Sequence, residues 1–158
     1  MTIYIGVSGP GDASDDEAKM AEEVGRRLAE HGAVVMCGGL GGVMDAAARG
    51  ATAAGGLAIG ILPGESRRGS SSHLTAAIPT GMGEARNALL VRAADAVIAI
   101  SGEFGTLSEI ALALKMGKPV VGLGTWELRK PDRTVDPMMT ARSAEEAVDL
   151  ALGAAGGP

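Results

Sequence analysis

Two charged side chains in the second half of the chain are candidates for chemistry, Arg86 and Glu109. The segment from Glu84 to Ala94 has apolar residues at helical spacing, which places Arg86 in the first turn of a predicted helix. A cation is unfavourable there, because the helix dipole is positive at its N-terminus. Arg86 therefore predicts an anionic partner, which is a substrate phosphate, Glu109 or simply Glu84.

Glu109 closes a stretch that has the layout of an anion-binding site, AVIAISGEFGTLSE over residues 96–109. Its apolar, β-branched start predicts a strand that is buried on both faces. Gly102 and Gly105 follow, and Thr106 is expected to cap a helix in which Glu109 completes a capping box. Glycines before a helix N-terminus leave N–H groups that favour a phosphate. The alternative is that they only make a tight turn and that Glu109 only completes the cap.

A second unit of strand, glycine turn and helix lies earlier in the chain. The run from Ala33 to Cys37 predicts a strand, GGLGG over residues 38–42 a turn, and Val43 to about Ala54 a helix. Two such units in one small chain predict a joint nucleotide site. A dinucleotide is disfavoured, because no Asp or Glu ends the strand that follows this helix.

Composition narrows the class of protein. The 158 residues are enough for one domain, and 25 glycines with only 2% aromatic residues favour a close-packed α/β core. A net charge of −5 argues against a protein that follows a nucleic-acid backbone. One cysteine, Cys37, and two histidines allow neither an internal disulfide nor a metal cluster. With neither a signal peptide nor an apolar run of membrane-spanning length, the sequence predicts a soluble cytoplasmic protein.

Strands and helices alternate along the chain. The predicted strands are Ile3–Val7, Ala33–Cys37, Leu57–Leu62, Ala76–Pro79, Ala96–Ile100 and Val120–Leu123. Alternation predicts an α/β, Rossmann-like three-layer fold with a mostly parallel sheet, formed by one domain over residues 1–158. Ligands bind such sheets at the carboxyl ends of their strands, where Ser8 and Gly9 follow the first strand.

The remaining segments are predicted to be irregular or terminal. Residues 124–137 are expected to form a loop, and a last helix is capped by Ser143 and ends near Leu152, so that residues 153–158 are disordered. The polar segment 65–75 is predicted to be a surface loop. Its Arg67, Arg68 and His73 either close over a bound phosphate as a lid or remain solvated.

Two long motifs carry a family resemblance. GGLGGVMDAAARGA and MGEARNALLVRAADAVIAISGEFGTLSEIALALKMGKPVVGL resemble the Rossmann-like family of the Lonely Guy (LOG) phosphoribohydrolases, the lysine decarboxylase-like proteins and the molybdenum cofactor carrier proteins. The resemblance covers roughly residues 3–123, and MGEARN with GKPVVGL is closest to the carrier-like branch.

In the hydrolase branch the resemblance implies cleavage of the N-glycosidic bond of a nucleoside 5′-monophosphate, with catalytic roles for Arg86 and Glu109. A carboxylate can stabilise the positive charge that develops on the ribose, and an arginine can hold that carboxylate ionised. The residues that match the nucleotide and phosphate site are Gly39, Gly41, Gly42, Met44, Gly102, Gly105 and Thr106, beside Ser8 and Gly9 of the first loop.

Two positions depart from the hydrolase pattern. Glu103 stands where a glycine is expected, and a carboxylate turned toward a phosphate would cost about 1 to 4 kcal/mol. Asn87 stands where the hydrolases carry a charged residue. Both departures weaken an enzymatic function more than a binding function.

The sequence thus leaves three hypotheses. The first is a protein that binds a nucleotide or a nucleotide-like cofactor, with the molybdenum cofactor as one candidate and no cofactor required for chemistry. The second is a phosphoribohydrolase that releases free base and ribose 5-phosphate. The third is a non-catalytic structural or regulatory oligomer. In all three, the helices that follow MGEARN and GEFGT are expected to form a homo-oligomer, and neither a nucleic-acid polymer nor a membrane is an expected partner.

Overall fold

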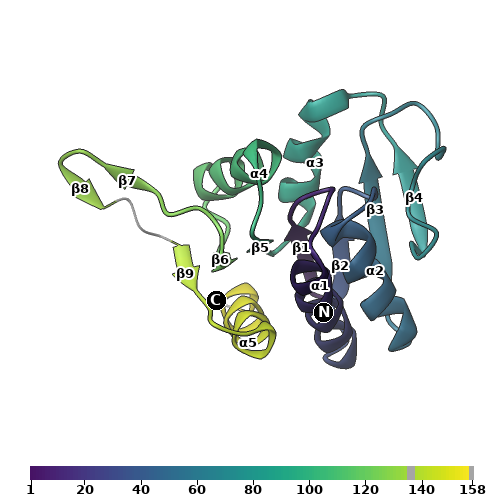
Figure 1. Ribbon diagram of the computed structural model, residues 1–158, viewed down its shortest axis with the longest axis horizontal. Helices are drawn as coiled ribbons and strands as arrows, with labels where there is room; N and C mark the ends of the chain where they lie inside the picture. Colours follow the sequence, from purple (N-terminus) through teal and green to yellow (C-terminus); the bar gives the residue numbers. More distant parts are fainter. Residues whose placement is uncertain (135–137, 157–158) are drawn as a thin grey trace.

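A parallel sheet lies between two layers of helices in the computed structural model, which describes residues 1–134 and 138–156 (Figure 1). The sheet has seven strands in the order β4-β3-β2-β1-β5-β6-β9, and every neighbouring pair is parallel. The strands are β1 (Tyr4–Ser8), β2 (Val34–Cys37), β3 (Ala58–Leu62), β4 (Ala76–Pro79), β5 (Ala96–Ile100), β6 (Val120–Leu123) and β9 (Met138–Thr140). The helices are α1 (Asp15–Glu30), α2 (Val43–Ala53), α3 (Arg86–Ala93), α4 (Phe104–Lys115) and α5 (Ala144–Ala155), with a short 3₁₀ helix η1 (Gly83–Ala85) before α3. The predicted α/β fold is confirmed.

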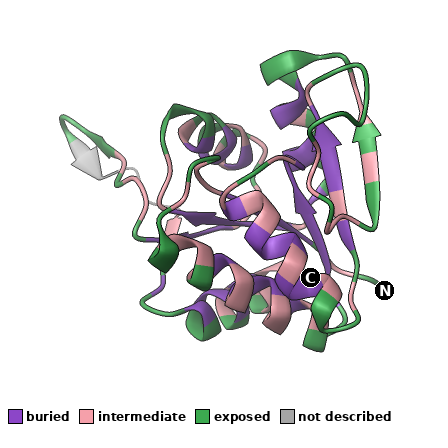
Figure 2. Ribbon diagram, turned by 45° about the vertical axis from the view of Figure 1, so that its right-hand side comes forward, coloured by how far each residue is buried: buried purple, intermediate pink, exposed green. Residues whose placement is uncertain are grey.

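Each face of the sheet has its own apolar core, because successive residues of a strand point to opposite faces. In β5, Ile98 and Ile100 pack with α1, α2 and α5, whereas Val97 and Ala99 pack with α3 and α4. All five residues of β5 are buried, as the central strands in Figure 2 show. This explains why β5 is a continuous apolar run rather than an alternating one.

The strand order reverses between β1 and its neighbour β5. From β1 the chain builds β2, β3 and β4 on one side, then returns to place β5, β6 and β9 on the other. Loops at the carboxyl ends of β1 and β5 therefore diverge, which leaves a crevice between them. The candidate site lies at this point.

All six predicted strands form, each within one residue of its predicted bounds. The prediction of a loop over residues 124–137 is wrong in part, because β7 (Arg129–Lys130) and β8 (Arg133–Thr134) pair as an antiparallel hairpin. The strand β9 was also missed. These strands have only two or three residues each, too few for a periodic pattern to reveal them. Residues 135–137 lie outside the described part of the chain.

The last helix is longer than predicted. It begins after the Ser143 cap, as expected, but continues through Ala155. Residues 153–155, predicted to be disordered, are therefore helical, since the alanines among them favour a helix. Residues 157–158 of the predicted tail are not described.

Helices α1 and α2 approach each other closely through glycine. A Cβ atom on Gly25 would lie 2.0 Å from the carbonyl oxygen of Ala47, and one on Gly50 would lie 2.0 Å from that of Glu22. Neither backbone can yield without moving a helix. The two glycines set the distance of α2 from α1, and hence the position of the glycine turn that precedes α2.

We predict that Gly25→Ala and Gly50→Ala each lower the free energy of unfolding by about 1 to 3 kcal/mol, because the added methyl group overlaps backbone. Thermal denaturation should show a loss of several degrees in Tm. Gly153→Ala is the matched control, since Gly153 is also helical but nothing lies within 4 Å of a Cβ there. An equal Tm for the three variants would contradict the proposed role of the two glycines in the helix contact.

Candidate functional site

A cavity of about 460 Å³ lies at the carboxyl ends of β1 and β5. Its walls are the loop after β1, the loop after β5, and the N-terminal turns of α3 and α4. The lining residues are Gly9, Pro10, Gly11, Asp12, Glu17, Met44, Glu84, Arg86, Asn87, Ser101, Glu103, Gly105, Thr106 and Glu109. The volume suits a mononucleotide-sized ligand.

Arg86 is a buried cation at the base of this cavity, with 8% of its surface exposed. Its Nη1 donates to the side-chain oxygen of Asn87, whose amide nitrogen donates to the Ser108 hydroxyl at 2.9 Å. Its Nε is buried and makes no hydrogen bond to any residue in the described part of the chain. Asn87 thus fixes the plane of the guanidinium while leaving one of its donors available.

Glu109 lies beside Arg86 and is 6% exposed. One carboxylate oxygen is 3.7 Å from Arg86 Nη1, too long for a hydrogen bond, and the other accepts from the Ser8 hydroxyl. Burial raises the pKa of Glu109 to about 7, although the Arg86 charge acts in the opposite direction and Glu84 adds to the rise. Near neutral pH the carboxyl is therefore only partly ionised, and it does not fully compensate Arg86.

The predicted capping box at Thr106 and Glu109 is wrong. Helix α4 begins at Phe104 and has Glu103 at its cap position, so Thr106 lies within the first turn. The chain turns immediately after β5, because Ser101 (φ 50°) and Gly102 (φ 107°) both take the left-handed conformation. This sharp turn starts the helix two residues early and carries Glu109 into the interior.

The two glycine turns, at residues 38–42 and 101–106, contribute differently to the cavity. Gly105 and Thr106 line the cavity, and Gly102 allows the turn, since a Cβ on it would lie 2.4 Å from Thr106. Gly42 (φ 60°) packs against the loop after β1, since a Cβ atom on it would lie only 2.2 Å from the Pro10 carbonyl oxygen.

Several predicted site residues line the cavity or contact one that does, namely Ser8, Gly9, Met44, Arg86, Gly105, Thr106 and Glu109. Gly39, Gly41, Gly42 and Gly102 do not line it, so a direct contact with a ligand stays a prediction for them.

Several carboxylates share the cavity wall with Arg86. Besides Glu109 they are Asp12, Glu17, Glu84 and Glu103. Glu103, the departure from the hydrolase pattern, is exposed and lines the cavity. Sequence reasoning missed Asp12, although its position four residues after β1 places it at the correct edge. Nothing in the sequence pointed to Glu17, because this residue reaches the cavity only where α1 crosses the end of β5.

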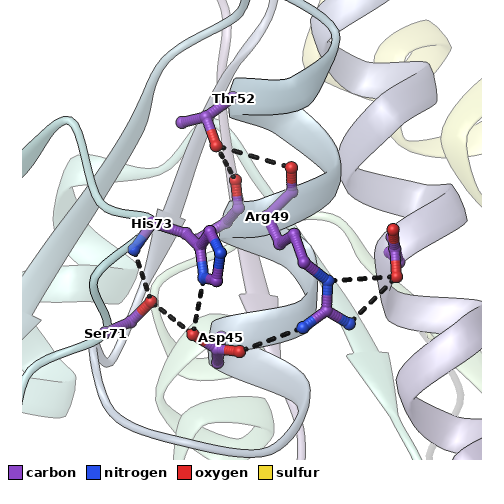
Figure 3. A network of polar contacts seen from close by, with 7 residues as sticks. Asp45, Arg49, Thr52, Ser71 and His73 are labelled. Atoms are coloured by element: carbon purple, nitrogen blue, oxygen red, sulfur yellow. Dashed lines mark hydrogen bonds and ion pairs between the residues drawn. The ribbon is translucent and has the colours of Figure 1, made fainter.

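The loop between β3 and β4 is attached to α2 by a polar network (Figure 3). Asp45 of α2 accepts from the Ser71 hydroxyl at 2.6 Å and lies 3.0 Å from His73 Nδ1. Arg49 joins Asp45 to Glu22 of α1. Burial by itself would raise the pKa of Asp45. The hydrogen bonds with Ser71 and His73 nevertheless hold this pKa below its usual value. None of the lid candidates His73, Arg67 and Arg68 lines the cavity.

Neither a metal site nor a membrane-spanning helix is found in the described residues. Within 1–134 and 138–156, no three His, Cys, Asp or Glu side chains are grouped as a metal site. In the same residues, every helix is too short or too polar to cross a lipid bilayer.

The pKa of Glu109 predicts a pH-dependent stability. Between about pH 4.5 and 7, the folded protein keeps a proton that the unfolded chain has lost, so its free energy of unfolding falls as pH rises through this window, by up to about 3 kcal/mol. Glu109→Gln removes this contribution. We expect the variant to gain stability relative to the unmodified protein from about pH 4.5 to pH 8, measured by urea denaturation.

Glu65→Gln is the control for this experiment, because Glu65 is exposed and does not line the cavity. If the free energy of unfolding changed with pH in the same way for the unmodified protein and for Glu109→Gln, Glu109 would not be the titrating group.

Comparison with known proteins identifies relatives along almost the whole chain. A protein of Archaeoglobus fulgidus, described as uncharacterized, is 41% identical over 150 residues, which are 95% of each chain. The molybdenum cofactor binding protein of Rippkaea orientalis has a similar structure, with a TM-score of 0.87, 38% identity and 97% of each chain covered. The molybdenum cofactor carrier protein of Chlamydomonas reinhardtii has a TM-score of 0.85 at 35% identity, covering 97% of this chain and 98% of its own.

These neighbours confirm the resemblance to the carrier-like branch of the LOG superfamily. The model of the SLOG cluster4 family matches residues 2–150. The chain therefore belongs to the SLOG cluster4 family.

Proposed function

We propose that the protein binds a small phosphate ester, either a nucleotide or a nucleotide-like cofactor such as the molybdenum cofactor, in the cavity between β1 and β5. One observation carries the proposal: the buried Arg86 side chain at the base of the cavity has a donor, Nε, with no acceptor among the described residues. A buried donor without a partner costs free energy, and more so when it is charged. An anionic ligand would supply the acceptor.

The start of α4 offers a second set of donors to the same ligand. The first N–H groups of a helix have no intrahelical acceptor, and the helix dipole favours an anion there. Gly105 and Thr106 of this first turn line the cavity together with Arg86. A phosphate between Arg86 and this turn would therefore bind to backbone and side-chain donors at once.

The carboxylates of the wall fit the rest of such a ligand. Of these carboxylates, Asp12 is an acceptor for hydroxyl or N–H groups, which a ribose, a base or a pterin carries. The carboxylates also disfavour a ligand with many negative charges close to the wall. This balance favours a monophosphate over a polyphosphate.

The structural neighbours support a binding function. Two of them are a molybdenum cofactor binding protein and a molybdenum cofactor carrier protein, each at more than a third identity over nearly the full chain. We also keep the prediction of a cytoplasmic homo-oligomer, for which the exposed Leu89 of α3 and Phe104 of α4 are candidate contacts.

Phosphoribohydrolysis is the second candidate, favoured by the placement of Arg86 and Glu109 on one wall of the cavity, 3.7 Å apart. A carboxyl that titrates near neutral pH can exchange a proton with water or a leaving group. Glu103 in the same wall and the neutral Asn87 next to Arg86 make this candidate the weaker one.

The binding proposal predicts that Arg86→Met lowers the affinity for the nucleoside 5′-monophosphate that binds best by about 10- to 100-fold, since it removes a charged hydrogen bond. Isothermal titration calorimetry with a panel of monophosphates measures this loss. Arg92→Met is the matched control, because Arg92 is on the same helix but is exposed and does not line the cavity. Equal affinities of the two variants would refute the role of Arg86.

Turnover is tested separately from binding. We expect nucleoside 5′-monophosphates to remain intact after prolonged incubation with the protein, as seen by mass spectrometry of the small molecules. Release of free base by the unmodified protein, together with its loss in Glu109→Gln at retained nucleotide affinity, would establish the hydrolase instead.

A further inference from the structure

A second hollow adjoins the cavity of the proposed site. It has a volume of about 420 Å³ and lies at the carboxyl ends of β5 and β6, next to the N-termini of α1 and α5. Glu17 and Ser101 line both hollows. The two hollows therefore meet along these residues and follow the edge of the sheet from β1 toward β9.

The residue at this junction has an unusual backbone. Ser101 is the one described non-glycine residue with a positive φ, at 50°. Strained backbone of this kind is concentrated at ligand sites. The positive φ turns the chain sharply after β5 and places Ser101 where the two hollows adjoin.

Apolar side chains form the floor of the second hollow. Ile100 and Leu123 from the ends of β5 and β6 are buried below it, together with Ala141. Met20 of α1 forms one side and is partly buried. Such a surface suits the face of a planar ring better than a second phosphate.

Charged side chains form the rim. Arg142 lines the hollow with an exposed guanidinium that makes no ion pair or hydrogen bond to the residues described. Asp16 lines it as well, and its carboxylate likewise accepts no described hydrogen bond. The carboxylate of Glu17 is already engaged, by the Ser14 backbone N–H at 2.9 Å. A ring in this hollow would meet one donor side chain and one acceptor side chain that have no other partner among the described residues.

We infer that the second hollow binds the ring of the ligand, and that it selects a fused pyrimidine whose edge carries a carbonyl oxygen next to N–H groups. This inference rests on the proposed function, in which the phosphate of the same ligand binds near Arg86. The carbonyl oxygen accepts from Arg142, and the adjacent N–H groups donate to Asp16, a pairing that uses both side chains.

Guanine and pterins present this edge, whereas adenine presents the reverse. At the corresponding positions adenine has an amino donor, which would face Arg142, and a ring nitrogen acceptor, which would face Asp16. With adenine, two donors would face each other at Arg142 and two acceptors at Asp16, so neither hydrogen bond could form. The hollow therefore discriminates between rings of almost equal size.

The test compares dissociation constants for GMP, IMP, AMP and ribose 5-phosphate, measured by calorimetry. We expect GMP to bind about tenfold or more tightly than AMP, with IMP between them, since each well-placed pair of hydrogen bonds discriminates to this degree. Arg142→Met and Asp16→Asn should each bring the ratio of AMP to GMP dissociation constants toward one and leave ribose 5-phosphate binding unchanged. Asp15→Asn is the control, because Asp15 is also in the first turn of α1 but lines neither hollow.

The outcomes separate the two proposals. If GMP and ribose 5-phosphate bind in an Arg86-dependent way but AMP binds as tightly as GMP, the inference about the ring is wrong and the proposed function stands. If none of these ligands binds, nor the monophosphate of 6-hydroxymethylpterin, both are wrong. Tighter binding of that pterin than of GMP would assign the ring as a pterin, and the reverse would assign it as guanine; either result supports the inference.

Discussion

A guanidinium and a carboxyl group, both buried at the end of the central strands, are the constraint on which the rest of this structure depends. Arg86 and Glu109 are too far apart for a hydrogen bond, and each is held by a different neighbour, Asn87 and Ser8. Burial keeps the pKa of Glu109 close to neutrality, so its charge offsets that of Arg86 only in part. The pair is therefore stable only in a fold that can compensate for its residual charge.

Carboxylates of the cavity wall offset part of that charge, and several elements of the fold together form the cavity. The reversal of strand order between β1 and β5 opens the crevice, and the early start of α4 directs its N-terminal N–H groups into it. The close contact of α1 with α2, set by Gly25 and Gly50, fixes the second glycine turn against the loop after β1. These elements are distant in sequence, yet each of them either lines a single cavity or supports a segment that does.

The sequence predicted the framework well and the local chemistry less well. The buried strands were correct because a short run such as β5, apolar throughout and bounded by a glycine turn, is typical of a strand that is covered on both faces. The capping box was wrong because Thr106 and Glu109 have the spacing of a cap, while the positive φ of Ser101, which shifts the helix, is not encoded in any pattern of residue types. Arg86 was recognised from the sequence by its unfavourable place in a first turn.

The roles of Glu17, Asn87 and Ser101 were not recognised from the sequence, because their positions depend on how whole helices cross the sheet.

The most direct test of the phosphate site is a crystal structure of the protein with the nucleoside monophosphate or pterin phosphate that binds best. We predict a phosphate oxygen within hydrogen-bonding distance of Arg86 Nε and close to the first turn of α4. A well-ordered ligand bound elsewhere on the molecule, or one in this cavity whose phosphate avoids Arg86, would contradict the proposed site.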